Sequence, residues 1–208
     1  MRTKKRLLLF LVPAALGLVA LAVGSASAGT TPKWYVGGSE LTGTESYAGV
    51  AEPSTMTAAG VSTKCEHSYY VASIFNSGGL GKGEVTSLPL YECSASGHNC
   101  TLTKNEPKKL PWSLHTVFEN SKPYLVIEGV SIEVSYSGFG CPLSGTHEVT
   151  GSLGGALEST TQKVVFNKSS QEATGSSLKS GFVPVEISGT YSTEAVGPEH
   201  RGQVVEAK

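Results

Sequence analysis

The stretch Tyr124-Leu-Val-Ile-Glu-Gly-Val-Ser-Ile-Glu-Val-Ser-Tyr136 carries the clearest structural pattern in this chain of 208 residues. In its second half, apolar and polar side chains alternate. The apolar face holds Val130, Ile132, Val134 and Tyr136, and the polar face holds Ser131, Glu133 and Ser135. Alternation with a period of two is typical of a strand with one buried face. We therefore expect a half-buried β-strand here.

Other segments rich in β-branched and aromatic residues surround this strand, and glycine-rich turns separate them. The expected strands are 61–65, 69–74, 84–93, 101–103, 145–153, 162–166, 183–191 and 202–207, and the expected turns are 77–83, 137–140, 154–155 and 197–198. Pro89 indicates an edge position or a bulge in its strand. Hairpin-length turns favour an antiparallel β-barrel or β-sandwich. The sequence predicts an all-β fold, with weak helical candidates only at 110–119 and 170–179.

The first 28 residues have the anatomy of a secretory signal peptide. A basic start at 1–6 is followed by an apolar run at 7–23 and by Ala26-Ser27-Ala28. This order predicts export and cleavage after Ala28. A membrane anchor is the alternative, but the apolar run is at the short limit for a span and Pro13 interrupts it. We expect residues 1–28 to be a signal peptide and 29–208 to be a single secreted β domain, extracellular or at the cell envelope, with no stable membrane span.

The charged residues exclude several classes of function. The signal segment carries four of the 16 basic residues and none of the 17 acidic ones, so residues 29–208 have a formal charge of −5. Residues 29–208 are acidic and contain Arg201 as their only arginine, which makes them unsuited to binding nucleic acid. All 17 acidic residues are glutamate, so aspartic dyads, EF-hand loops and triads built on aspartate are excluded.

The exported part contains four cysteines, Cys65, Cys93, Cys100 and Cys141. An even number of cysteines in a secreted chain predicts a disulfide framework, with three possible connectivities. Because a loop-like segment separates Cys93 from Cys100, we expect this pair to staple a hairpin and Cys65–Cys141 to join distant strands. A zinc site using Cys93, His98 and Cys100 is the less favoured alternative, since the spacing does not fit common zinc motifs.

No motif in the sequence predicts a catalytic centre, a cofactor or a metal site. The glycine-rich segment 78–83 departs from the phosphate-binding loop at two positions, and Ser176-Ser-Leu-Lys179 lacks the partner motifs of penicillin-recognising enzymes. Histidines occur singly and are interpreted as surface residues, at His67, His98, His115, His147 and His200. A triad of His67 or His147 with a distant serine and glutamate is an open alternative.

Two tryptophans are the candidate ligand-contact aromatics. Trp112 follows a proline behind the basic run 104–109, and Trp34 lies just after the predicted cleavage site. An exposed tryptophan could stack on a sugar ring. The favoured interpretation is that each one plugs the core, because large aromatic side chains are usually mostly buried.

Several short motifs resemble those of a family of secreted β-rich proteins from actinobacteria. The resembling segments are Leu110-Pro-Trp112, Cys93 and Cys100 ahead of it, Ala173-Thr-Gly-Ser-Ser-Leu-Lys179 and Gly189-Thr-Tyr-Ser-Thr-Glu-Ala195. The resemblance covers most of residues 29–208. It implies export and a β-rich domain, and it assigns no activity and no catalytic residue.

Together these features favour a secreted, non-enzymatic β domain that binds a partner, a glycan or other envelope component, or a small apolar ligand. One alternative is a secreted hydrolase that uses a glutamate with a histidine or a serine. The other is a purely structural envelope protein. A lined apolar cavity would favour ligand binding, whereas a cleft that brings together Glu, His and Ser would favour the hydrolase.

Overall fold

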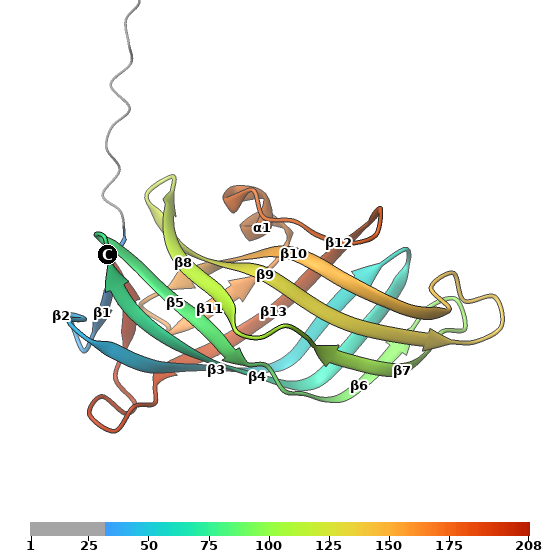
Figure 1. Cartoon of the computed structure of the whole chain (residues 1–208), viewed down its shortest axis with the longest axis horizontal. Helices are drawn as coiled ribbons and strands as arrows, with labels where there is room; N and C mark the ends of the chain where they lie inside the picture. The colour runs from blue at the N-terminus through green and yellow to red at the C-terminus, as the bar shows by residue number, and fades with distance from the viewer. Residues whose placement is uncertain (1–31) are drawn as a thin grey trace, which may run out of the picture.

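The computed structural model describes residues 32–208, in which strands dominate and one short helix occurs (Figure 1). The prediction of an all-β, antiparallel fold is confirmed. The predicted signal peptide, residues 1–28, lies outside the described residues. The elements are β1 (Trp34–Val36), β2 (Ser39–Glu40), β3 (Thr44–Ala58), β4 (Val61–Ser77), β5 (Leu80–Ser87), β6 (Leu90–Ser96), β7 (Thr101–Pro107), β8 (Trp112–Glu119), β9 (Lys122–Ser137), β10 (Gly145–Glu158), β11 (Lys163–Phe166), α1 (Lys168–Thr174), β12 (Leu178–Ser180), β13 (Val183–Ala195) and β14 (Val205–Ala207).

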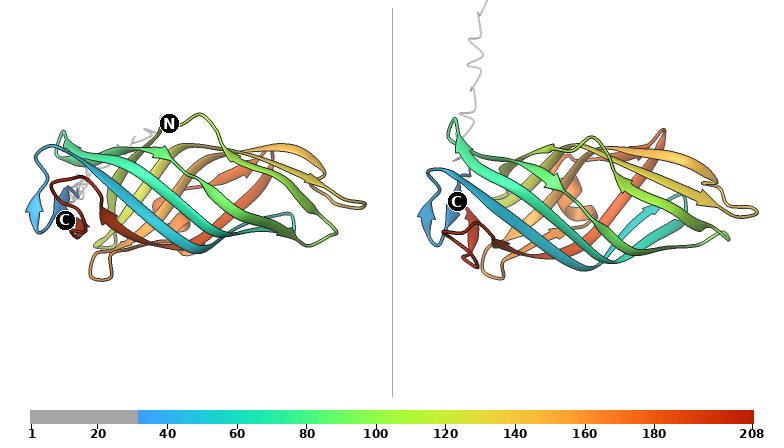
Figure 2. Two further views of the ribbon diagram at one scale, coloured as in Figure 1. Left: turned by 90° about the horizontal axis from the view of Figure 1, so that it is seen from below. Right: turned by 60° about the horizontal axis from the view of Figure 1, so that its bottom comes forward.

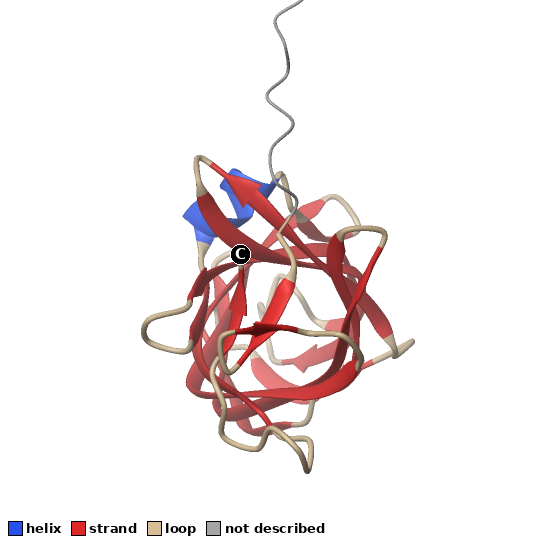
Figure 3. Ribbon diagram, turned by 90° about the vertical axis from the view of Figure 1, so that its left-hand side faces the viewer, coloured by secondary structure: helices blue, strands red, loops and turns tan. Residues whose placement is uncertain are grey.

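The large sheet closes on itself. Antiparallel pairings run without interruption through β3, β4, β5, β8, β9, β10, β11 and β13, and β13 pairs again with β3. We call this closed set of strands the strand ring; Figure 3 shows it from one end. The segment 124–136 lies within β9, and all four apolar residues of its predicted inner face are buried. The ladder of this closed sheet is interrupted where neighbouring strands part.

The strands first part between β4 and β9. At one end β5 and β8 fill the space and pair with each other. At the other end β6 pairs with β4 and β7 pairs with β9, but no backbone pairing joins β6 to β7 in the described chain. The side-chain amide of Asn105 on β7 crosses this gap, and its Nδ2 donates to Cys65 Sγ at 3.4 Å and to Cys93 Sγ at 3.6 Å. We call this gap the β6/β7 break.

The strands part again between β10 and β13, and here helix α1 lies in the opening. β11 pairs with both strands at one end, and β12 pairs with both at the other. The Ser170 hydroxyl donates to the Gly154 carbonyl of β10 at 2.7 Å, and Gln171 Nε2 donates to the Ile187 carbonyl of β13 at 2.9 Å. These two buried side chains supply the bonds that the ladder lacks at this point. We call this opening the α1 break.

A small sheet of the first two described strands and the last strand closes one end of the strand ring. β1 pairs with β14 and with β2, so the C-terminal segment lies beside the first described strand (Figure 2). Trp34 anchors this small sheet, because its backbone N–H donates to Asn76 Oδ1 at 2.7 Å and its indole Nε1 donates to the Lys82 carbonyl at 2.9 Å. A buried tryptophan whose indole N–H has a hydrogen-bond acceptor is well suited to closing this end of the strand ring, which we call the plugged end.

Several predictions of local structure need correction or adjustment. The strand expected at 84–93 is divided between β5 and β6, which part at Leu88–Pro89, and β5 begins inside the turn expected at 77–83. The segment 110–119 is not helical but contains β8, where residues alternate between buried and more exposed along the strand. The pair Gly154–Gly155 is not a turn but lies within β10, where side chains at these positions would overlap Thr174 and Phe166. The helix expected at 170–179 is shorter and earlier, because Asn167 caps its start and Gly175 ends it in a left-handed conformation.

The disulfide framework is confirmed, but the favoured connectivity is wrong. The bonds join Cys65 to Cys93 and Cys100 to Cys141. Cys93 faces Cys65 because β6 pairs with β4, which places the two residues directly opposite each other. Cys100 begins the segment that pairs with the end of β9, next to the loop that contains Cys141. Neither Cys93 nor Cys100 is therefore free for the zinc alternative.

The close approach of β3 to Tyr70 gives a test of this packing. A Cβ at Gly49 would overlap the buried ring of Tyr70, whereas a Cβ at Gly43 would meet open space. We expect Gly49→Ala to lower the free energy of unfolding by about 1–3 kcal/mol. Gly43→Ala is the matched control and should change it by less than about 0.5 kcal/mol. Urea unfolding measures both, and equal stabilities for the two variants would contradict the packing described.

Candidate functional site

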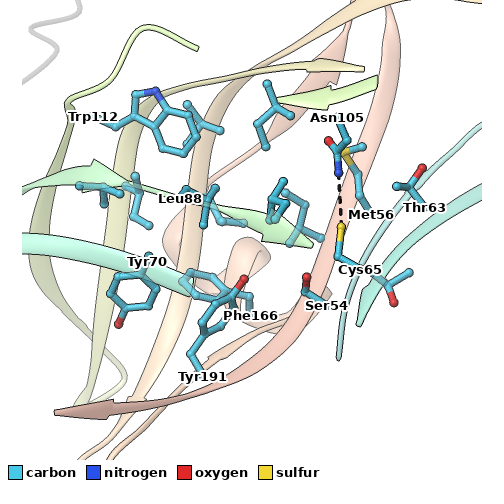
Figure 4. A pocket seen from close by; sticks show the side chains of 18 residues that line it. Ser54, Met56, Thr63, Cys65, Tyr70, Leu88, Asn105, Trp112, Phe166 and Tyr191 are labelled. Atoms are coloured by element: carbon cyan, nitrogen blue, oxygen red, sulfur yellow. Dashed lines mark hydrogen bonds between the residues drawn. The ribbon is translucent and has the colours of Figure 1, made fainter. Parts of the chain in front are cut away.

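The interior of the strand ring contains an apolar cavity of about 70 Å³ (Figure 4). It lies between the two breaks, since residues from both sides line it. The wall residues are Ser54, Thr55, Met56, Thr63, Cys65, Tyr70, Val85, Leu88, Leu90, Asn105, Trp112, Ile127, Val130, Ile132, Leu153, Phe166, Ile187 and Tyr191. Protein interiors are normally close-packed, so a cavity with this lining is a candidate ligand site.

The thinnest part of the wall lies on the side of the β6/β7 break. Leu88, Leu90 and Asn105 line the cavity and are also partly exposed to solvent. Leu88 precedes Pro89 in the segment where the chain leaves β5 and begins β6. A ligand could therefore reach the cavity by displacing these side chains, without unfolding the paired strands.

Two wall residues carry a buried polar atom without a hydrogen-bond partner, Asn105 Oδ1 and the Tyr70 hydroxyl. Asn105 Oδ1 is buried, and no hydrogen bond reaches it from residues 32–208. The other end of the same amide is occupied by the disulfide sulfurs of Cys65 and Cys93, which hold the side chain in place. Buried acceptors are rarely left unpaired in folded proteins. Asn105 Oδ1 is thus an oriented acceptor in an otherwise mainly apolar cavity.

Aromatic rings form the opposite side of the interior. Tyr47, Tyr70, Tyr191 and Phe166 follow one another with ring centroids 5.4–5.7 Å apart. The Tyr191 hydroxyl is 2.8 Å from Ser68 Oγ, but the hydroxyls of Tyr47 and Tyr70 are buried without a well-formed hydrogen bond. Burial raises the pKa of Tyr47, Tyr70 and Tyr191, and raises that of Tyr70 well above its ordinary value.

The structure buries both candidate aromatics. Trp34 is 0% exposed and Trp112 is 3% exposed, so neither side chain is available on the surface to stack on a sugar, and the core interpretation holds. The Trp112 indole Nε1 donates to the Lys108 carbonyl at 2.8 Å. One face of Trp112 nevertheless lines the cavity, so this residue is a ligand-contact candidate from the inside.

A second, polar hollow of about 490 Å³ lies at the plugged end, between residues 36–46 and 197–200. Its buried Glu45 carboxylate accepts bonds from the backbone N–H groups of Ser46 at 3.0 Å and Gly197 at 2.9 Å. His200 Nδ1 donates to the same carboxylate at 2.5 Å. A buried carboxylate that orients an imidazole is a feature of hydrolytic sites, but here it also fastens the 197–200 segment to β3. Ser46 joins this cluster through its backbone, and the hydrolase alternative stays a prediction.

The other histidines do not form a common site. His147 Nε2 is 2.9 Å from the Leu143 carbonyl, His98 is exposed beside Gly60, and His67 lies on β4 opposite Tyr91. His115 lies on β8, opposite Lys82 of β5. Within the described residues, no group of three or more His, Cys, Asp or Glu side chains is placed to hold a metal ion. Across residues 32–208, no helix has the length and apolar character needed to cross a membrane.

Sequence reasoning missed both functional candidates. Asn105 stands in the run 104–109, whose lysines suggest a solvated surface, and only the β6/β7 break turns its amide inward. Glu45 and His200 are separated by 155 positions, and no local pattern connects them.

No protein-family model, no curated protein and no solved structure matches this chain. The resemblance to secreted proteins of actinobacteria therefore stays a prediction. The case for function depends on the residues of the cavity and of the surface.

The buried tyrosines predict a loss of stability in alkali. Because the pKa of Tyr70 is raised in the folded state, the unfolded chain loses its proton first as the pH rises above about 10. The stabilisation is complete below pH 10 and is lost as the pH rises toward the pKa of the folded state. We expect the urea midpoint to fall steadily above pH 10, with the tyrosinate absorbance of the buried tyrosines appearing only on unfolding, whereas exposed tyrosines such as Tyr91 ionise in the folded protein. Tyr70→Phe should make this fall shallower, and an unchanged pH profile in that variant would contradict the assignment.

Proposed function

We propose that this protein is an exported, non-enzymatic binding domain that takes a slender apolar molecule with one hydrogen-bond donor into the cavity of the strand ring. The observation that carries the proposal is Asn105 Oδ1, an unpartnered acceptor on the cavity wall. The apolar part of the ligand would contact Trp112 and Leu88, and its hydroxyl or amine would donate to Asn105. Satisfying a buried acceptor while filling apolar space is the usual chemistry of small-molecule pockets.

The setting proposed is the cell envelope or the extracellular space. Two disulfides indicate an oxidising environment, and the signal-peptide pattern at residues 1–28 supports export. Burial of Trp34 and Trp112 removes the feature that favoured a glycan, and the cavity favours the small apolar ligand.

The size of the cavity limits the ligand class. Its volume of about 70 Å³ is about half that of an engineered apolar cavity of about 150 Å³ that binds benzene. The cavity therefore suits a group of three or four heavy atoms, such as a short alcohol or the hydroxyl-bearing end of a longer chain. The rest of a longer ligand would leave past Leu88 at the β6/β7 break.

The two tryptophans allow a direct test by nuclear magnetic resonance. We expect 1-propanol to shift the Trp112 indole N–H signal in a saturable way, with a dissociation constant in the millimolar range, equivalent to about −4 kcal/mol. The Trp34 signal should not move, because Trp34 does not line the cavity. Asn105→Leu keeps the branched shape but removes the acceptor, so binding should weaken roughly 2- to 10-fold, the value of one hydrogen bond.

Two size variants serve as controls. Leu88→Ala enlarges the cavity and should shift the preferred chain length of the alcohol upward, whereas Leu102→Ala lies outside the wall and should not. Parallel, non-saturable shifts of both indole signals would show a general solvent effect and would overturn the proposal.

A further inference from the structure

Two phenylalanines protrude fully into solvent at loop tips. Phe139 is 98% exposed and Phe182 is 103% exposed, so neither ring makes significant contact with the rest of the protein. Gly138 and Gly140 flank Phe139, and Gly181 precedes Phe182. Large aromatic side chains are usually mostly buried, so two wholly exposed phenylalanine rings on loop tips are unusual.

Both tips lie at the same end of the strand ring. Phe139 is in the loop from β9 to β10, and Phe182 is in the turn from β12 to β13. β10 pairs antiparallel with both β9 and β12, which brings the two connections to the end where β10 begins. In Figure 1 the β9–β10 loop forms the right-hand tip, away from the plugged end, and the β12–β13 turn projects upward near α1 in the same half of the molecule. We call the end where β10 begins the open end.

The open end differs in charge from the rest of the molecule. Its four connections, with the residues that flank them, carry Lys179 and no carboxylate; they are 59–62, 94–103, 135–147 and 177–185. The connections at the plugged end include or adjoin the carboxylates Glu40, Glu119, Glu158 and Glu199, together with the basic residues Lys122, Lys163 and Arg201. The difference between the two ends is thus the absence of carboxylates from the connections of the open end. The remainder of this acidic domain would be repelled by an anionic surface, and the open end would not.

We propose that the open end docks on a lipid surface, with Phe139 and Phe182 inserting between the headgroups. The two rings stand on separate projecting tips and do not line a groove, which suits a deformable layer better than a shaped protein pocket. Aromatic and apolar side chains that face a polar interface are the usual anchors of proteins that lie on membranes. The neutral tips and Lys179 permit approach to anionic headgroups, which fits a protein of the cell envelope.

The test is co-sedimentation of the exported form of the protein with vesicles of phosphatidylcholine and phosphatidylglycerol. We expect Phe139→Ser and Phe182→Ser each to weaken partitioning by about tenfold, and the double variant by about 100-fold. Tyr91→Ser is the matched control, because Tyr91 is an exposed aromatic on β6 away from the loop tips, and it should bind like the wild type. Unfolding in urea checks that the variants remain folded.

Depth of insertion supplies a second measurement. Trp introduced by Phe182→Trp should shift its emission to the blue with vesicles and be quenched by brominated acyl chains. The proposal is overturned if the wild type does not sediment with vesicles, or if the double variant binds as tightly as the wild type. Phenylalanine-dependent self-association without vesicle binding would overturn it too, in favour of a second copy of this chain as the occupant.

Discussion

The backbone hydrogen bonds of a closed sheet are the constraint on which this structure depends. Eight strands pair in an unbroken ring, and the ladder is interrupted where neighbouring strands diverge. At the α1 break, Ser170 and Gln171 bond to the carbonyls of the flanking strands. At the β6/β7 break, the Cys65–Cys93 disulfide and the Asn105 amide take that place. Side chains of α1 therefore hold the first interruption, whereas side chains of the flanking strands themselves hold the second.

The cavity follows from the position of these two breaks. They lie on either side of the interior, and β-strand side chains from neither side fill the space between them completely. Asn105 takes part in both the β6/β7 break and the cavity. Its Nδ2 donates to a disulfide sulfur across the break, while its Oδ1 has no partner in the cavity wall. The residue whose side chain spans the gap between β6 and β7 therefore also supplies a hydrogen-bond acceptor to the cavity. This double role distinguishes the cavity from a simple packing defect.

Local patterns in the sequence identified many of the strands but missed β3, misread the β8 segment as helical, and did not give the strand partners. The alternation at 130–136 reports burial of one face, which is a property of a single strand, and the structure agrees. The turn predicted at Gly154–Gly155 failed because those glycines accommodate Thr174 and Phe166, which come from other elements. The cysteine pairing failed for a similar reason, since the β4–β6 register decides it. Asn105 and the Glu45–His200 pair depend on contacts that no local pattern records.

The central claim is that the ring interior between the two breaks admits an apolar guest. A crystal of the protein pressurised with xenon tests this most directly, because xenon enters apolar cavities without needing a hydrogen bond. The account predicts one ordered xenon site inside the ring, in contact with Trp112 and Leu88. An interior without xenon, or with Leu88 collapsed into the space, would contradict it.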